Sequence, residues 1–333
     1  MTCSDPTPNA CRAGGGDSLT QARKTTVNKF LLALLLLALL SPGSARADVT
    51  RAPGDPIYAH ISRYAAVIPP NDDPADIYYP DDPGSTSGDQ RLPFALLLQG
   101  ANVDKQFYEG FARTVAGYGF VVVVPNHKTT VFFQTGLFAQ EDEVNEVLAF
   151  MTSEDANASS PLHGKIDTQT MALLGHSYGG AVGLNAIAGK CQFPFCIGFR
   201  FNRPAALKGG AFYGTNLKGP VGGIPELDNQ GIPIALVQGT LDGMAAPAAG
   251  KETFDKIQDP PKAYVPIEGA NHYGITDVND PPGAKPDPNQ PEISQALSVK
   301  TIGKWSALFL RAYVLGDAEA RAYFTSNCGC RIA

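Results

Sequence analysis

Residues 171–181 have the sequence MALLGHSYGGA, in which an apolar run leads into Gly175-x-Ser177-x-Gly179 and then into small residues. Strand, tight turn and helix in this order are typical of a nucleophile elbow, where a serine occupies a strained backbone turn. The glycines are needed because a Cβ at either position would collide with a neighbouring strand or helix. The turn exposes the serine oxygen at a helix N-terminus, where backbone N–H groups can face a developing oxyanion. The stretch therefore predicts Ser177 as a catalytic nucleophile.

A serine nucleophile needs a base and a carboxylate that orients the base, and with this kind of elbow the acid and then the histidine follow it in the chain. Among five histidines, only His272 lies downstream of the elbow by more than one residue, so it is the predicted base. It lies in a loop after the strand-like residues 263–267. Asp242 follows the strand-like residues 233–239 and is the predicted acid. The alternative for Asp242 is a turn or helix-cap aspartate.

An oxyanion needs two N–H donors. One is expected from Tyr178, the residue after the nucleophile, which also lies at the mouth of the site. The other is expected from Ala101, in the loop after the apolar strand 92–99, where Gly100 permits a tight turn. For the Asn102 side chain there are two interpretations, an additional donor or a solvated loop residue.

The remaining histidines are expected to be structural. His176 adjoins the nucleophile, but neighbouring residues on an elbow point in different directions, so it is predicted to be packed and hydrogen-bonded. His60, His127 and His163 show no metal-ligand spacing with one another or with the cysteines. The sequence therefore predicts no metal site.

The composition is that of a globular protein with a substantial core. The chain has 333 residues, 44% of them hydrophobic, and a net charge of −6. No basic run occurs outside the N-terminal leader, so a nucleic-acid partner is not expected.

The N-terminus has the pattern of a secretory signal peptide. The apolar residues 30–40 follow Arg23, Lys24 and Lys29, and small residues at the two positions that a signal peptidase recognises end at Ala47. The apolar run is short for a transmembrane helix, so we expect cleavage after Ala47 and no stable membrane insertion afterwards. An uncleaved anchor is the alternative. The expected location is secreted or periplasmic.

The predicted organisation is a signal peptide over 1–47 and a single catalytic domain over 48–333, since no internal repeat is visible. The stretch before Val27 is polar and long for the start of a signal peptide. We therefore hypothesise that Val27 is the true start and that residues 1–26 are a mis-assigned extension.

The cysteines indicate disulfides. Cys3 and Cys11 would leave with the leader, and an even number then remains in an exported chain. The remaining cysteines are Cys191, Cys196, Cys328 and Cys330. The first choice joins Cys191 to Cys196, which leaves Cys328 and Cys330 to close a very tight ring. Crossed pairing between the two segments is the alternative, and a zinc site is a weaker one because the spacings are unusual.

Continuous apolar strands alternate with helices along the chain, which predicts a mostly parallel central sheet with helices on both faces. The expected strands are 57–68, 75–79, 94–99, 120–124, 171–174, 210–213, 234–237 and 263–267. The expected helices are 105–117, 141–151, 181–188 and 295–314.

Three stretches lie outside this scheme. Residues 81–91 are a polar hairpin or loop. Residues 190–207 contain a cysteine pair and several phenylalanines, and form either a lid or rim over the pocket or an ordinary packed excursion. Residues 276–291 are rich in Asp, Asn and Pro; we expect a solvated loop rather than a calcium site, because the spacing matches no ligand loop.

Together these features resemble the α/β-hydrolase fold, in the branch of chlorophyllase, platelet-activating-factor acetylhydrolase and the polyester hydrolases (cutinase-like). The matching pieces are residues 75–80, 97–100 and 116–125, the elbow, and the loops of Asp242 and His272. The sequence departs from many relatives at Gln99, where they carry His or Pro before the glycine.

The resemblance implies a serine carboxylic-ester hydrolase that works through an acyl-enzyme and needs no cofactor. Ser177 would attack the carbonyl, His272 would transfer the proton and Asp242 would orient His272, with Tyr178 and Ala101 as oxyanion donors. The substrate would be a small-molecule or lipid ester; lipase-like, cutinase-like, acetylhydrolase-like and chlorophyllase-like activities are alternatives. The alternative of a different class is a non-catalytic secreted binding module on the same fold.

Overall fold

The computed structural model describes residues 51–81, 91–131, 133–197, 200–219 and 223–332. The predicted signal peptide over 1–47 and nearly all of the predicted loop over 81–91 lie outside these ranges.

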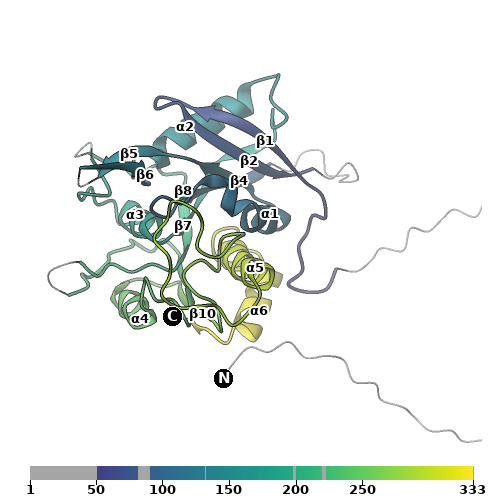
Figure 1. Ribbon diagram of the computed structural model, residues 1–333. Coiled ribbons are helices and arrows are strands. Elements are labelled where there is room, and N and C mark those ends of the chain that lie inside the picture. Colours follow the sequence, from purple (N-terminus) through teal and green to yellow (C-terminus); the bar gives the residue numbers. More distant parts are fainter. Residues whose placement is uncertain (1–50, 82–90, 132, 198–199, 220–222, 333) are drawn as a thin grey trace, which may run out of the picture. The chain divides into compact units, whose positions relative to one another are not determined.

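A sheet of nine strands in the order β1-β2-β4-β3-β7-β8-β9-β10-β11 forms the centre of the described chain (Figure 1). Strands β4 to β10 of this order run parallel, whereas β1 and β2 at one edge and β11 at the other pair antiparallel. The strands are β1 (Ile61–Ile68), β2 (Asp73–Pro80), β3 (Leu92–Leu98), β4 (Val121–Pro125), β7 (Ile166–His176), β8 (Leu207–Tyr213), β9 (Ile234–Gly239), β10 (Lys262–Ile267) and β11 (Arg331–Ile332). A separate hairpin consists of β5 (Lys128–Val131) and β6 (Gln134–Leu137).

Helices cover both faces of the sheet (Figure 1). They are η1 (Lys105–Tyr108), α1 (Glu109–Gly117), α2 (Glu143–Ala156), α3 (Tyr178–Ile187), α4 (Pro247–Lys256), α5 (Gln295–Tyr313) and α6 (Ala318–Asn327). Helices α1, α5 and α6 share one buried apolar cluster with the sheet, and α2, α3 and α4 share another. The central strands are apolar throughout because successive side chains alternate between the two faces. Ala95 and Val122 belong to the first cluster, and Leu96 and Val123 to the second.

The prediction of a mostly parallel sheet with helices on both faces is confirmed, with changes at the ends of elements. The first strand begins at Ile61 rather than at 57, because the N–H groups of Ile57 and Tyr58 donate to Gly117 O instead of to a strand. The first helix opens as the 3-10 turn η1, in which the Asp104 side chain accepts from the N–H of Gln106. The hairpin β5–β6 and helix α6 were not predicted.

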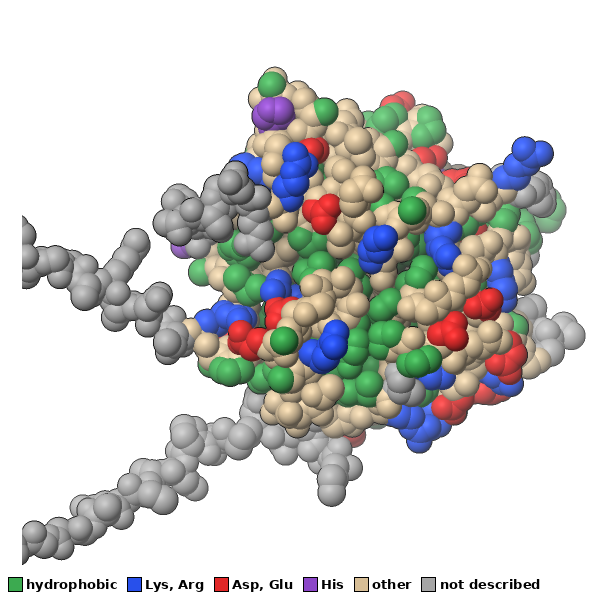
Figure 2. All heavy atoms as spheres, turned by 180° about the vertical axis from the view of Figure 1, so that it is seen from behind, with side chains coloured by type: hydrophobic (Ala, Val, Ile, Leu, Met, Phe, Trp, Pro, Cys, Tyr) green, Lys and Arg blue, Asp and Glu red, His purple; other side chains and the backbone are tan. Residues whose placement is uncertain are grey.

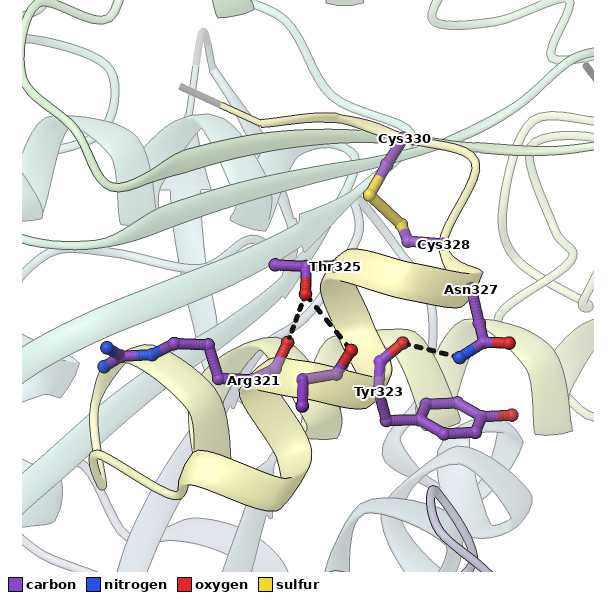
Figure 3. Close-up of a disulfide and its surroundings, with 7 residues drawn as sticks. Arg321, Tyr323, Thr325, Asn327, Cys328 and Cys330 are labelled. Carbon is purple, nitrogen blue, oxygen red and sulfur yellow. Dashed lines mark hydrogen bonds between the residues drawn. A yellow bond between two sulfur atoms is a disulfide. The ribbon is translucent and has the colours of Figure 1, made fainter.

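Two disulfides are formed, Cys191–Cys196 and Cys328–Cys330, so the crossed pairing is wrong. Figure 3 shows the Cys328–Cys330 bond at the C-terminal end of α6. Within the last turns of this helix, Thr325 Oγ1 donates to two backbone carbonyl oxygens. The turn after α6 brings β11 to the edge of β10, where the two strands pair antiparallel.

The surface carries charges of both signs. On the face seen in Figure 2, Lys and Arg side chains are interspersed with Asp and Glu side chains among polar and apolar groups. Within the described ranges, no helix combines the length and the apolar character needed to span a bilayer.

Candidate active site

Ser177 occupies a sharp turn between β7 and α3, with φ of 52° and ψ of −118°. This backbone conformation is costly for a residue with a side chain, and such strain is typical of functional positions. A Cβ at Gly175 would lie 2.9 Å from a Cα atom of α3, and one at Gly179 would lie 2.2 Å from the carbonyl oxygen that ends β3. The glycine spacing in the sequence is thus explained by close packing of the elbow against both elements.

The structure brings Ser177, His272 and Asp242 into one hydrogen-bonded line. Ser177 Oγ lies 2.9 Å from His272 Nε2, and His272 Nδ1 lies 2.9 Å and 3.0 Å from the two carboxylate oxygens of Asp242. His272 and Asp242 are buried, whereas Ser177 is partly exposed. Because Nδ1 faces a carboxylate, it carries the proton in the neutral ring, which leaves Nε2 free to accept the proton of the serine hydroxyl.

The Asp242 carboxylate is fixed by the turn that follows β9. One oxygen accepts the N–H groups of Met244 (2.9 Å) and Ala245 (2.7 Å), and the other accepts from Gln238 Nε2 (3.0 Å). Asp242 is therefore both a turn aspartate, which was the alternative interpretation, and the hydrogen-bond partner of His272. These donors satisfy the buried carboxylate and orient it toward the imidazole.

Asp287 was missed in the sequence, although it holds the two triad loops together. Its carboxylate accepts the backbone N–H of His272 (2.7 Å) and the N–H of Gly243, at 3.2 Å and 3.3 Å from its two oxygens. The side chain is buried, so the expectation of a solvated loop over 276–291 is wrong at this residue. No local signal distinguishes Asp287 from the other acids of that loop, because its partners lie on distant segments.

The N–H groups of the two predicted oxyanion donors are both free within the described part of the chain. Among the described residues, those of Ala101 and Tyr178 have no hydrogen-bond partner. On either side of Ala101, the N–H of Gly100 donates to Tyr108 Oη (2.9 Å) and the N–H of Asn102 donates to Leu137 O (2.7 Å). The N–H of Tyr178 is free because it lies in the first turn of α3, and the N–H of Ala101 is free within a loop, so both are available to a ligand oxygen.

The Asn102 side chain has a contact that the sequence did not predict. Its Oδ1 accepts the N–H of Leu137 (3.1 Å), so Asn102 attaches the β5–β6 hairpin to the loop after β3. A hollow of about 450 Å³ borders this loop and includes Asn102, Phe107 and Leu137 in its lining.

His176 is packed beneath the triad, as predicted. Its Nδ1 lies 2.9 Å from Tyr108 Oη, and its Nε2 lies 3.0 Å from the backbone carbonyl of His272. Burial, together with the nearby His272, lowers the pKa of His176 well below its ordinary value, so the ring is neutral. A neutral ring accepts from Tyr108 through Nδ1 and donates to the carbonyl through Nε2. His176 thereby connects the loop of Gly100 to the loop of His272.

An aromatic rim lies beside the nucleophile. The Tyr178 ring contacts Phe138 and Phe195, with ring centroids 5.6 Å and 5.2 Å away, and Tyr178 Oη donates to Pro194 O (3.1 Å). Burial raises the pKa of the Tyr178 phenol, which therefore stays protonated. The described part of the 190–207 segment, closed by the Cys191–Cys196 bond, thus packs against the residue next to Ser177.

The order of the strands and the position of the serine turn define the class of protein. The turn leaves β7 in the middle of the sheet, and the loops after β9 and β10 carry an aspartate and a histidine that reach it. This arrangement is that of the α/β-hydrolase fold, so the chain has the α/β-hydrolase fold that the sequence predicts.

Within the superfamily, the chlorophyllase family model matches residues 63–199. The match contains Ala101 and Ser177, whereas Asp242 and His272 lie beyond its end. No curated protein matches the chain. The family match indicates a hydrolase of ester bonds.

Proposed function

We propose that the chain is a serine carboxylic-ester hydrolase that works through Ser177, His272 and Asp242. The observation that carries this proposal is the unbroken line of contacts from Ser177 Oγ to His272 Nε2 (2.9 Å) and from His272 Nδ1 to Asp242 (2.9 Å). The strained backbone of Ser177 and its place at the start of α3 support the same role.

In the first half of the reaction, Ser177 Oγ attacks the ester carbonyl carbon while His272 Nε2 takes the hydroxyl proton. Asp242 holds the ring through Nδ1 and stabilises the imidazolium. When the tetrahedral intermediate collapses, the proton passes from Nε2 to the leaving alcohol and an acyl-Ser177 remains. In the second half, water attacks the acyl group by the same route, which releases the carboxylic acid and restores the serine.

The negative charge on the former carbonyl oxygen is stabilised by the N–H groups of Tyr178 and Ala101. Each such donor typically contributes roughly 3 kcal/mol to lowering the barrier. Neither N–H group has a hydrogen-bond partner among the described residues, which supports this role.

The surroundings of Ser177 favour esters with an apolar part. Phe138, Tyr178 and Phe195 place aromatic surface beside the nucleophile. Such surface suits an acyl chain or an apolar alcohol, as in lipid-ester, polyester or chlorophyll-type substrates, more than a small charged ester.

We also infer that the chain is exported, to the periplasm or the medium. The leader over 1–47 has the pattern of a cleaved signal peptide, and the two disulfides are bonds that persist in oxidising compartments.

The proposal is tested by hydrolysis of a series of p-nitrophenyl esters of increasing acyl length. Wild type is compared with Ser177→Ala and with Ser159→Ala, an exposed serine that serves as the matched control. We expect activity in wild type and the control, loss in Ser177→Ala, and a preference for acyl chains longer than acetyl. Equal activity in all three proteins, or none toward any ester, would contradict the proposal; the second outcome would favour a binding module.

A further inference from the structure

A second cluster of polar side chains lies next to Gln99, the residue before the oxyanion loop of Gly100 and Ala101. Asp73 begins β2, His127 follows β4, and Glu143 and Glu146 lie in the first turns of α2. His127 Nδ1 lies 2.7 Å from an oxygen of Asp73, and the ligand atoms of Asp73, His127 and Glu146 all lie within 4.8 Å of one another. Metal ligands drawn from three separate elements leave no spacing signature in the sequence, which explains why His127 gave no such signal there.

Glu143 is a further buried carboxyl in the same turn of α2 as Glu146. It is 1% exposed; one carboxylate oxygen accepts the N–H of Gln140 (2.6 Å), and the other, Oε2, has no partner among the described residues. Glu143 and Glu146 are three residues apart, so they share a face of α2. Burial raises the pKa of both carboxyl groups, and the charge of the nearby His127 opposes that rise.

The cluster has an excess of acceptors over donors. Three carboxyl groups lie near one imidazole, and only the carboxyl of Asp73 is directly bonded to it. Both oxygens of Glu146 accept from Asn71 Nδ2 (3.2 Å), and one oxygen of Glu143 accepts the N–H of Gln140. The remaining Glu143 oxygen, Oε2, is buried and has no hydrogen-bond partner among the described residues. Each unsatisfied buried oxygen is costly, and a cation is the ligand that satisfies oxygen acceptors of this kind.

We propose that Asp73, His127 and Glu146 bind a divalent transition-metal ion, with the buried carboxyl of Glu143 next to the ligands. An imidazole combined with carboxylates suits ions such as Zn²⁺ or Mn²⁺, whereas Ca²⁺ takes oxygen ligands alone. Ligand atoms about 2.1 Å from such an ion lie roughly 3–4 Å from one another, so small side-chain rotations would close the observed cluster around it.

The site has a structural route to the oxyanion loop. The Gln99 side chain donates from Nε2 to His127 O (2.8 Å) and accepts the His127 N–H at Oε1 (3.1 Å). Gln99 directly precedes Gly100 and Ala101. A cation on His127 would therefore stiffen the loop that carries the Ala101 donor. This consequence rests on the proposed function, whereas binding of the ion does not.

The experiment is titration of the chelator-treated mature chain with Zn²⁺ by calorimetry, at fixed pH. Wild type is compared with Glu143→Gln and His127→Asn. Two control variants test whether Zn²⁺ binds elsewhere. His60→Ala removes an exposed histidine, and His272→Asn removes the histidine that pairs with Asp242. Circular dichroism establishes that each variant is folded. Glu143→Gln remains decisive if His127→Asn does not fold, because the amide keeps the shape of the side chain.

We expect wild type and both controls to bind one Zn²⁺ with the same affinity. Glu143→Gln should bind about ten- to a hundredfold more weakly, and folded His127→Asn should lose the site. The proposal is overturned if wild type binds no Zn²⁺, if Glu143→Gln binds as tightly as wild type, or if only His272→Asn loses binding. None of these readouts depends on ester hydrolysis.

Discussion

Two buried histidine–aspartate pairs in this molecule have nearly the same internal geometry and different surroundings. His272 Nδ1 lies 2.9 Å from Asp242, and His127 Nδ1 lies 2.7 Å from Asp73. On the far side of its ring, His272 faces Ser177, whereas His127 lies among the carboxyl groups of α2. The comparison teaches that the pair itself does not define a catalytic base. A nearby hydroxyl makes one pair suitable for proton transfer, and nearby acids make the other suitable for a cation.

The largest difference between the pairs should appear in turnover. His272→Ala removes the proposed base, so kcat should fall by about 10⁴-fold or more, as for the loss of a triad member in other serine hydrolases. His127→Ala should change kcat by less than about tenfold, provided the variant is folded. Steady-state hydrolysis of one p-nitrophenyl ester measures both. Losses of equal size would contradict the division of roles.

The second difference concerns pH and stability in the presence of a chelator. Burial opposes the charge on His127, but the hydrogen bond to Asp73 and the nearby Glu143, Asp73 and Glu146 outweigh it and raise the pKa of His127 to about 9, from an ordinary value of 6.5. Because the folded-state pKa is the higher one, this stabilisation is fully present below about pH 6.5 and is lost as the pH rises through 9. The free energy of unfolding should therefore fall by up to about 3 kcal/mol across that window.

Urea unfolding at several pH values between 6 and 10 measures this change. Asp73→Asn removes the hydrogen-bonded partner of His127, so its stability should fall less than that of wild type in the same window. The fall caused by Glu141, whose pKa burial raises to about 8, should be the same in both proteins. A wild-type curve that is flat or that rises from pH 6.5 to 9 would show that His127 is not held in the charged form.

A third prediction concerns Asp287, which holds the backbone of His272 in place. Asp287→Asn weakens the bond from the His272 N–H to the carboxylate and the link to the loop of Asp242. We expect kcat to fall about ten- to a hundredfold with little change in KM, because misplacement of the base affects the reaction more than binding. Asp228→Asn, at an exposed aspartate, is the matched control. If both variants behave like wild type, Asp287 does not position His272.

The smallest effect is expected at Tyr108, which connects the oxyanion loop to His176. Tyr108→Phe leaves the N–H of Gly100 and Nδ1 of His176 without their shared partner. The free energy of unfolding should fall by about 1–3 kcal/mol and kcat by less than about tenfold. Thermal unfolding and steady-state kinetics measure the two quantities. If Tyr108→Phe lowers kcat more than Asp287→Asn does, Tyr108 is more important for catalysis than Asp287, contrary to this account.

The sequence was sufficient for the features that depend on local pattern. The apolar strands, the glycines around Ser177 and the chain order of Asp242 and His272 lead to the sheet and to a specific choice of three residues, because each signal lies in a short segment. Element ends were less accurate: the first strand begins later than expected because backbone groups near Ile57 bond to α1.

The features that the sequence did not reveal depend on contacts between distant segments. Asp287 looks like any acid in a polar loop until its carboxylate is seen to accept the N–H of His272. The bond from the Leu137 N–H to Asn102 Oδ1 attaches a hairpin that was not predicted. The cluster around His127 combines β2, the segment after β4, and α2. Pairings of this kind leave no periodicity or spacing in the chain.

The central claim is that Ser177 is an activated nucleophile, and covalent labelling tests it most directly. Wild type, Ser177→Ala and His127→Asn are treated with a fluorophosphonate ester, and the masses of the intact proteins are measured by mass spectrometry. The account predicts a single adduct on Ser177 in wild type and in folded His127→Asn, and none in Ser177→Ala. A wild-type protein that stays unlabelled, or an adduct that persists in Ser177→Ala, would contradict it.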